Sequence, residues 1–197
     1  MHLTHADRGD AFARLAPLTP ALVPALAAIA DSNPQIFAHW PRDVSGGYAA
    51  EADWLLGEQA ARRWLVHVVY DAQGRVVGQT CYLALRPDHS GVEIGGTWYA
   101  PEIQGTAVNP AAKRMMLGHA FASGAERVEL KTDARNARSR AAILKMGAQF
   151  EGVFRRHMRR PDGTWRDTAW YSVIREDWPA VKAGLDARIA ACTTQRS

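Results

Sequence analysis

The chain has 197 residues, of which 47% are hydrophobic and 22% are charged, and its formal net charge is +4. These values are typical of a globular protein and exclude a disordered or fibrous chain. No apolar run is long enough to span a membrane, and the N-terminal residues lack a secretion signal, so we expect a cytoplasmic protein without a membrane partner. The length favours one domain over residues 1–197, with its core at about 11–190 and frayed termini.

The first part of the chain predicts scaffold elements and one unusual loop. Alternation over residues 11–18 predicts a strand, and Thr19 with Pro20 begins a predicted helix that ends near Ala30. The connection at 31–47 is interrupted by Pro and Gly. Aromatic side chains in such a loop either plug the edge of the core or line a substrate cleft, and both interpretations stay open for its large residues, which are Phe37, His39, Trp40 and Arg42.

The next segment predicts a helix at 48–62 and then two strands joined by an Ala-Gln-Gly turn. The inward face of the helix is expected to contain Trp54, Leu55 and Leu56. In the strands, His67 is expected to be a surface or hydrogen-bonded residue rather than a catalyst, and Cys81 to be a small core residue. Two cysteines in the whole chain do not indicate a disulfide framework.

A strand is predicted at 92–100, followed by a loop of small residues and a helix at 110–123. Gly95 and Gly96 weaken the strand but permit close approach by another backbone or a ligand. Pro110 is expected at the first helical position, with Asn109 as the cap. Amides at such a helix N-terminus could bind an anion such as a diphosphate.

The last part of the chain predicts a strand at 126–132, a helix capped by Asn136 and ended by Gly147, and a hairpin of strands at 151–160 and 164–174. Asp177 is expected to cap a final helix that ends near residue 190.

Positive charge is concentrated near the C-terminal half, because residues 131–166 contain ten Lys or Arg and only three acids. A basic face could bind nucleic acid, an acidic peptide or the phosphates of a nucleotide. Trp and Tyr residues are missing from this segment until Trp165, which makes nucleic acid the weaker alternative. The histidines do not cluster with Cys or carboxylates at ligand spacings, so no metal site is predicted.

The order of these motifs, with NARSRAAILKMGA at 136–148 and the hairpin and final helix after it, resembles the GNAT superfamily of acyl-coenzyme A-dependent N-acyltransferases. Within it, the chain is similar to the RimJ/RimL type of ribosomal-protein N-terminal acetyltransferase. The resemblance covers about residues 12–189. It implies an α+β fold with a central mixed, mostly antiparallel twisted sheet of six to seven strands, splayed between two parallel strands and flanked by helices.

The same resemblance implies an activity. The chain would transfer an acetyl or other acyl group from acetyl-CoA, without a metal, to a primary amine of a protein N-terminus or a small molecule, by direct attack in a ternary complex. Two alternatives stay open, a catalytically silent acyl-CoA-binding module and a nucleic-acid-binding protein. Dimers are common in this fold, so a homodimer is a further expectation.

The resemblance also implies site residues. The cofactor would be bound by the strand before the loop, by the loop itself and by the later helix that Asn136 caps, at Trp98, Tyr99, Gln104, Gly105, Thr106, Ala107, Val108, Asn109, Asn136, Ser139 and Lys145. Trp40, Trp54 and Trp98 would wall the acceptor cleft. From the residue alone, Asn136 could equally be no more than a helix cap.

Three catalytic candidates follow from the resemblance. Ser139 would hydrogen-bond the departing thiolate, because the tyrosine that many members place at Ile143 is missing. Glu93 would deprotonate the amine through water, with a pKa raised by burial, unless it is a surface residue. His157 is a second candidate base, because the glutamate of RimL-like enzymes is replaced by the neighbouring Met158. Ala107 stands where the family loop usually has a second glycine.

Overall fold

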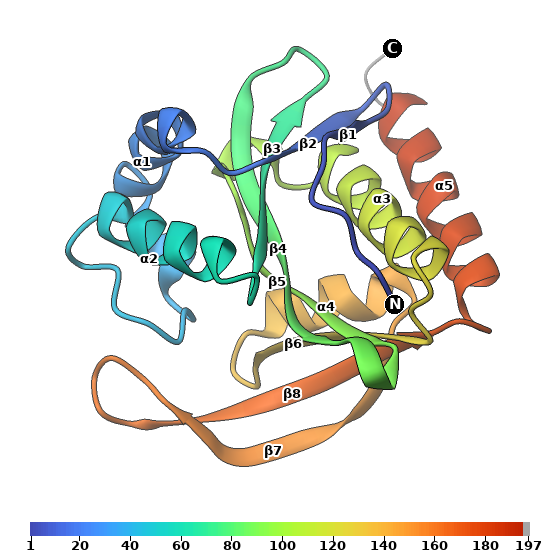
Figure 1. Cartoon of the computed structure of the whole chain (residues 1–197). Coiled ribbons are helices and arrows are strands. Elements are labelled where there is room, and N and C mark those ends of the chain that lie inside the picture. Colours follow the sequence, from blue (N-terminus) through green and yellow to red (C-terminus); the bar gives the residue numbers. More distant parts are fainter. Residues whose placement is uncertain (195–197) are drawn as a thin grey trace.

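The computed structural model describes residues 1–194. One eight-stranded sheet forms its centre, in the order β1-β2-β3-β4-β5-β6-β8-β7 (Figure 1). The strands are β1 Arg8–Gly9, β2 Ala13–Pro17, β3 Leu65–Asp71, β4 Val76–Arg86, β5 Gly91–Tyr99, β6 Arg127–Asp133, β7 Gln149–Arg159 and β8 Trp165–Ile174. Neighbouring strands are antiparallel except β5 and β6, which run parallel. The predicted fold is confirmed, and the additional strand, β1, is only two residues long and too short to produce an alternating pattern.

Helices cover both faces of this sheet. They are α1 Val23–Asp31, α2 Tyr48–Ala60, α3 Val108–Ala122, α4 Ala137–Met146 and α5 Trp178–Thr194. In Figure 1, α1 and α2 lie on one side of β3 to β5, while α3 and α5 lie on the other side. Two separate buried clusters result, one between the sheet and α1–α2, and one between the sheet and α3–α5. None of the helices within residues 1–194 is long and apolar enough to cross a membrane.

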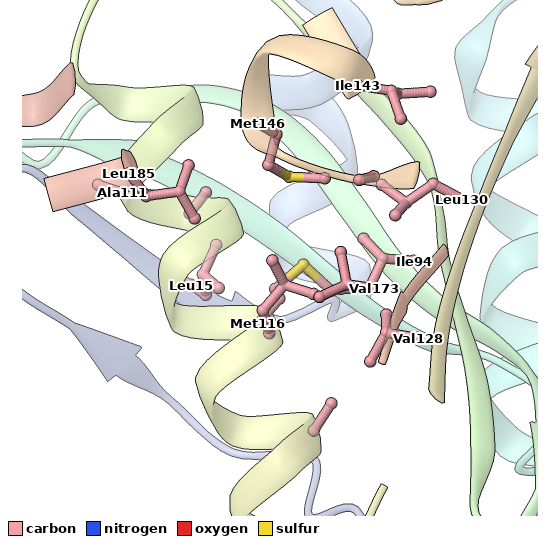
Figure 2. Close-up of a cluster of buried hydrophobic side chains, with 14 of the residues drawn as sticks. Leu15, Ile94, Ala111, Met116, Val128, Leu130, Ile143, Met146, Val173 and Leu185 are labelled. Carbon is pink, nitrogen blue, oxygen red and sulfur yellow. The ribbon is translucent and has the colours of Figure 1, made fainter. Parts of the chain in front are cut away.

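The larger cluster joins α3, α4 and α5 to the middle of the sheet. Figure 2 shows Met116 of α3 and Met146 of α4 directed toward side chains of β5, β6 and β8, and Leu185 of α5 next to Ala111 of α3. Met116 and Leu185 are fully buried. Burying one such side chain stabilises the fold by about 1.5–3 kcal/mol, so this cluster holds α3 and α4 firmly against the strands that border the candidate site.

Local sequence rules located some helix ends and misplaced others. The predicted ends of α4 are confirmed, because the Asn136 Oδ1 accepts a hydrogen bond from the Ser139 amide at 2.9 Å and Gly147 is left-handed with φ +104°. The predicted start of α3 is wrong by two residues, since Ala107 is the cap and Pro110 is the third helical residue. Proline is tolerated there because the first four N–H groups of a helix have no intrahelical partner.

Two further helix predictions need correction. In α2 only Leu55 of the expected inward face is fully buried, while Trp54 is 38% exposed because it borders a cavity. The helix α5 continues to Thr194, beyond its expected end near residue 190, and the rest of the tail lies outside the described residues. Asp177 precedes α5 and its carbonyl accepts from the Val181 amide at 3.0 Å, but its carboxylate accepts from the Ile174 amide instead of capping the helix.

Candidate functional site

The two parallel strands separate soon after they meet. Their ladder contains only the pairs Gly91–Arg127, Val92–Val128 and Glu93–Glu129. Beyond Glu93, β5 remains paired with β4 and β6 with β8, but within residues 1–194 no strand occupies the edge of β5 that faces β6. An unpaired strand edge offers main-chain donors and acceptors to an extended ligand that carries amide groups. The expected splay between parallel strands is therefore present.

A cavity of about 1010 Å³ lies at this splay. This volume is at the upper end of the range for small-molecule and cofactor sites. One half is bordered by the loop at 104–109, α4 and the C-terminal part of α5, and it is called the cofactor half because the resemblance would assign it to the cofactor. The other half is bordered by the loop before α2, by α2 itself and by the β7–β8 hairpin, and it is called the acceptor half because the resemblance would assign it to the acceptor.

The loop at 104–109 contains an alternating row of free amides. Three of its amides are bonded within the loop region at 3.2–3.3 Å, those of Gln104, Thr106 and Val108. The three others make no hydrogen bond to any part of residues 1–194, and these are the amides of Gly105, Ala107 and Asn109. They lie at the N-terminus of α3, where the helix dipole favours negative charge. This loop can therefore hold an anion through its main chain.

The backbone angles explain why one glycine is needed in this loop and a second one is not. Gly105 has φ +81°, a left-handed conformation that side chains rarely adopt. Ala107 has φ −67° and ψ −17°, which are ordinary helical angles for alanine. The alanine at the position where the family pattern has glycine is thus unstrained, and it leaves its own amide free.

Basic side chains flank the loop. A smaller cavity of about 260 Å³ next to Gly105 is bordered by Lys145 from α4 and Arg188 from α5. Cys192 donates a hydrogen bond from its Sγ to the Gly105 carbonyl at 3.6 Å, which ties α5 to the loop. Sequence reasoning selected Lys145 but missed Arg188, because residues of α5 are far from the loop in sequence and only the packing of α5 on α3 brings them together.

The N-terminal turn of α4 contributes Asn136 and Ser139 to the wall of the cavity. The Asn136 side chain caps the helix, so the interpretation as a cap is correct, and the residue also borders the cavity. The Ser139 Oγ makes no hydrogen bond to the described residues and is free to bond a ligand. One turn further along α4, the apolar side chain of Ile143 also borders the cavity.

Glu93 is buried at the point where the splay begins. It is 2% exposed, and its Oε2 lies 2.7 Å from the Lys131 Nζ. Burial raises the pKa of Glu93, and the charge of Lys131 opposes this shift only in part. Gly95 leaves room for this carboxylate, because a Cβ there would lie 2.9 Å from the Glu93 Oε1 and the side chain would have to shift. The close approach at this glycine is therefore made by a carboxylate of the protein, and the alternative of a surface glutamate is excluded.

His157 does not join this group. It lies exposed on β7, where its Nδ1 is 3.1 Å from the Thr168 Oγ1 and its ring packs against Phe154 and Trp170. Its neighbour Met158 borders the cavity instead. The reason is a bulge in β7 between Phe154 and Met158, which shifts the register of the strand.

The three predicted wall tryptophans all border the cavity, and so do Gly105 and Asn136. Trp98 is 4% exposed and packs edge-on against Tyr48 at 5.4 Å between ring centroids. Trp40 donates from its indole to Glu51, and the Arg42 guanidinium lies 3.2 Å from the centre of the Trp54 ring. Arg42 is also paired with the buried Glu51. The wall of the acceptor half is therefore aromatic, and the ion pair of Arg42 and Glu51 holds two of its tryptophans in place.

Lys113 of α3 is a buried lysine that sequence reasoning did not select. It is 8% exposed and donates to Thr97 at 2.8 Å and to Thr80 at 3.3 Å, and burial lowers its pKa to about 8. The sequence did contain an indication of this burial, because Lys113 is spaced so that it lies on the same helix face as the apolar residues Met116 and Ala120. Among residues 1–194 no group of three or more His, Cys, Asp or Glu side chains could hold a metal ion.

Comparison with known proteins agrees with this geometry. The sequence pattern of the family described as "Acetyltransferase (GNAT) domain" matches residues 13–149. A protein of T. thermophilus classed with the acetyltransferases is 34% identical, with a TM-score of 0.85 over 96% of this chain and 100% of that one. A GCN5-related N-acetyltransferase from Brucella melitensis is 28% identical, with a TM-score of 0.82 over 93% of this chain and 85% of that one.

A third similar structure is RimJ of Mycobacterium smegmatis, solved in complex with CoA-disulfide. It is 24% identical, with a TM-score of 0.75 over 92% of this chain and 91% of that one, a similarity that concerns the fold alone. None of the curated proteins matches the chain in sequence.

Proposed function

Because the chain belongs to the GNAT family of acetyltransferases, we propose that it transfers an acetyl group from acetyl-CoA to the primary amine of a small molecule or a protein N-terminus. The observation that carries this proposal is the combination of three free amides at the start of α3 with an unpaired edge of β5 along one cavity. Free amides at a helix start can bind a diphosphate, and an unpaired strand edge can bind an arm that carries amide groups. A ligand that contains both parts needs the two features side by side.

The residues of the cofactor half fit coenzyme A. The amides of Gly105, Ala107 and Asn109 would bind the pyrophosphate, and Lys145 and Arg188 would lie near the phosphorylated nucleotide. The main chain of β5 near Trp98 and Tyr99 would pair with the amides of the pantetheine arm, while Asn136 would face the same arm from α4. When bound, acetyl-CoA supplies the thioester that the amine attacks.

Glu93 is proposed as the general base, acting through water. An amine must lose a proton before it can attack, and a carboxylate with a raised pKa is better matched to that task near neutral pH. Lys131 keeps the carboxylate in one orientation through the contact at 2.7 Å. His157 is outside the wall of the cavity and is therefore the weaker candidate.

Ser139 is proposed to stabilise the departing sulfur by a hydrogen bond. Its hydroxyl is free, and it lies in the first turn of α4, where partial positive charge favours an anion. A serine hydroxyl is too weak an acid for complete proton transfer, so water would supply the proton. A cytoplasmic location and a homodimer remain expectations, and sedimentation of the purified protein tests the second.

The proposal is tested by incubating the protein with acetyl-CoA and a panel of primary amines. We expect release of free thiol and a matching gain of one acetyl group on an amine, detected by mass spectrometry. Glu93→Gln is expected to lower kcat by about 10²- to 10⁴-fold, while Glu176→Gln, at an exposed position after β8, is the matched control. If calorimetry finds no binding of coenzyme A, the proposal is wrong. Binding with turnover that is unaffected by Glu93→Gln would point to a different base.

A further inference from the structure

One arginine in the acceptor half has no ionic partner. Arg166 of β8 is 4% exposed and borders the cavity, yet no carboxylate within residues 1–194 lies within 4.0 Å of its guanidinium. Its Nε is buried without a hydrogen bond to any of the described residues, and its Nη1 makes one long contact of 3.5 Å with the His39 carbonyl. A buried cation without an ionic partner lowers the stability of a fold. Such a residue is therefore expected at a functional site, where a bound ligand supplies the missing hydrogen-bond acceptors.

The nearby charges are already paired with other groups. Asp133 accepts from the Arg160 guanidinium at 2.7 Å, and its second oxygen accepts from the Arg135 amide at 2.9 Å. Glu93 is held by Lys131. These two acids act on Arg166 only from a distance, and burial lowers the pKa of its guanidinium. Arg166 is therefore the one charged donor in the acceptor half, among the described residues, that has neither a carboxylate nor a hydroxyl partner.

The position of Arg166 is suited to contact with an acceptor. It lies opposite Met158 in the β7–β8 ladder, and its contact with His39 reaches the loop before α2. Figure 1 shows this loop and the turn end of the hairpin on the same side of the molecule. Arg166 and Glu93 border the same cavity. An acceptor with its amine near Glu93 would share this cavity with the Arg166 guanidinium.

We propose that the amine acceptor carries a carboxylate close to its amine and that Arg166 is the specificity-determining residue that binds this carboxylate. The inference rests on the proposed function and names the substrate class of the same site. A guanidinium presents a planar fork of N–H donors that matches a carboxylate in geometry and charge. A polyamine would instead bring further positive charge next to Arg166, which this site disfavours.

The carboxylate could come from two sources, the α-carboxylate of a free amino acid or the side chain of an acidic N-terminal residue. The test therefore has two arms of matched amines. One compares alanine with alaninamide, and the other compares peptide amides that begin with Asp or Asn. In each arm kcat/KM for acetyl transfer is measured with the wild type, Arg166→Met and Arg166→Lys. Arg159→Met, at an exposed arginine of the same hairpin, is the control for a general loss of positive charge.

We expect the wild type to prefer the carboxylate-bearing member of at least one pair by about tenfold to a hundredfold, because charged hydrogen bonds are among the stronger ones. This ratio is expected to fall toward one in Arg166→Met, to recover in part in Arg166→Lys and to stay unchanged in Arg159→Met. Structural damage would lower both rates of a pair and leave the ratio intact. No preference in either arm, or a preference that survives in Arg166→Met, overturns the inference.

The outcome is separable from that of the proposed function. If amines are acetylated without regard to the carboxylate, the proposed function stands and the inference fails. If none is acetylated, calorimetric titration of the same matched compounds into the complex with coenzyme A decides, and the carboxylate-bearing member is expected to bind about tenfold or more tightly. Equal affinity there contradicts the inference.

Discussion

Replacement of the buried Lys113 by methionine is expected to stabilise the protein at pH 7. The ammonium is 8% exposed and has no carboxylate among the described residues within 4.0 Å, only the hydroxyls of Thr80 and Thr97. Burial lowers its pKa from 10.5 to about 8. A shift of this size corresponds to about 3 kcal/mol of unfavourable free energy for the charged form in the folded state. Methionine has a similar volume and no charge, and the two hydroxyls remain bonded to each other at 2.7 Å.

The gain is expected to depend on pH. Below about pH 8 the lysine is charged in both the folded and the unfolded protein, so the whole penalty is present. Between about pH 8 and 10.5 the folded protein loses the proton while the unfolded chain keeps it, and the stability of the wild type rises with pH. Lys113→Met lacks this titration. Its advantage of about 2–3 kcal/mol at pH 7 should therefore shrink as the pH approaches 10.

Urea denaturation of both proteins from pH 6 to 10 measures this difference. Lys182→Met is the matched control, because Lys182 is exposed on α5 in an ion pair with Asp186 and its replacement should change stability by no more than about 0.5 kcal/mol. A loss of stability in Lys113→Met at pH 7, or a difference that does not vary with pH, would refute the reasoning. Either result would mean that the ammonium is stabilised where it lies.

Three further changes test the cofactor half and the base. Gly105→Ala is expected to weaken coenzyme A binding several-fold by calorimetry, because a side chain at φ +81° costs about 1–2 kcal/mol, whereas Ala107→Gly is expected to change the affinity less than twofold. Arg188→Gln is expected to weaken coenzyme A several-fold and 3′-dephospho-coenzyme A much less, and equal losses would place the arginine away from the 3′-phosphate. The raised pKa of Glu93 predicts that kcat/KM falls as the pH drops through a value above 4.5, a limb that should be absent in Glu93→Gln.

Features that depend on neighbours in sequence were predictable. The cap at Asn136, the left-handed Gly147 and the final hairpin follow from hydrogen bonds and turn angles within a few residues. The splay between parallel strands came from the resemblance to a family, whereas the anion-binding loop at 104–109 was indicated by its small residues before a predicted helix, and the structure contains both. The order of the motifs in the sequence therefore indicates these parts of the fold.

Features that depend on contacts distant in sequence were not predictable. Pro110 is equally acceptable at the first and third helical positions, so the sequence could not fix the start of α3. Arg166 differs from the other arginines of the hairpin only in its burial, which arises when the hairpin meets the loop before α2. The extent to which Lys113 is buried was not predictable for the same reason, because it depends on the packing of α3 against Thr80 and Thr97.

The most direct test of the proposed coenzyme A site is a nuclear magnetic resonance titration of the ¹⁵N-labelled protein with coenzyme A. The amides of Gly105, Ala107 and Asn109 are unbonded among the described residues, so a diphosphate bound there should shift their proton resonances downfield more than those of the bonded amides between them. Resonances of the unpaired part of β5 should respond as well. If the three amides stay unchanged while coenzyme A binds, the phosphate site is elsewhere and the proposed site is wrong.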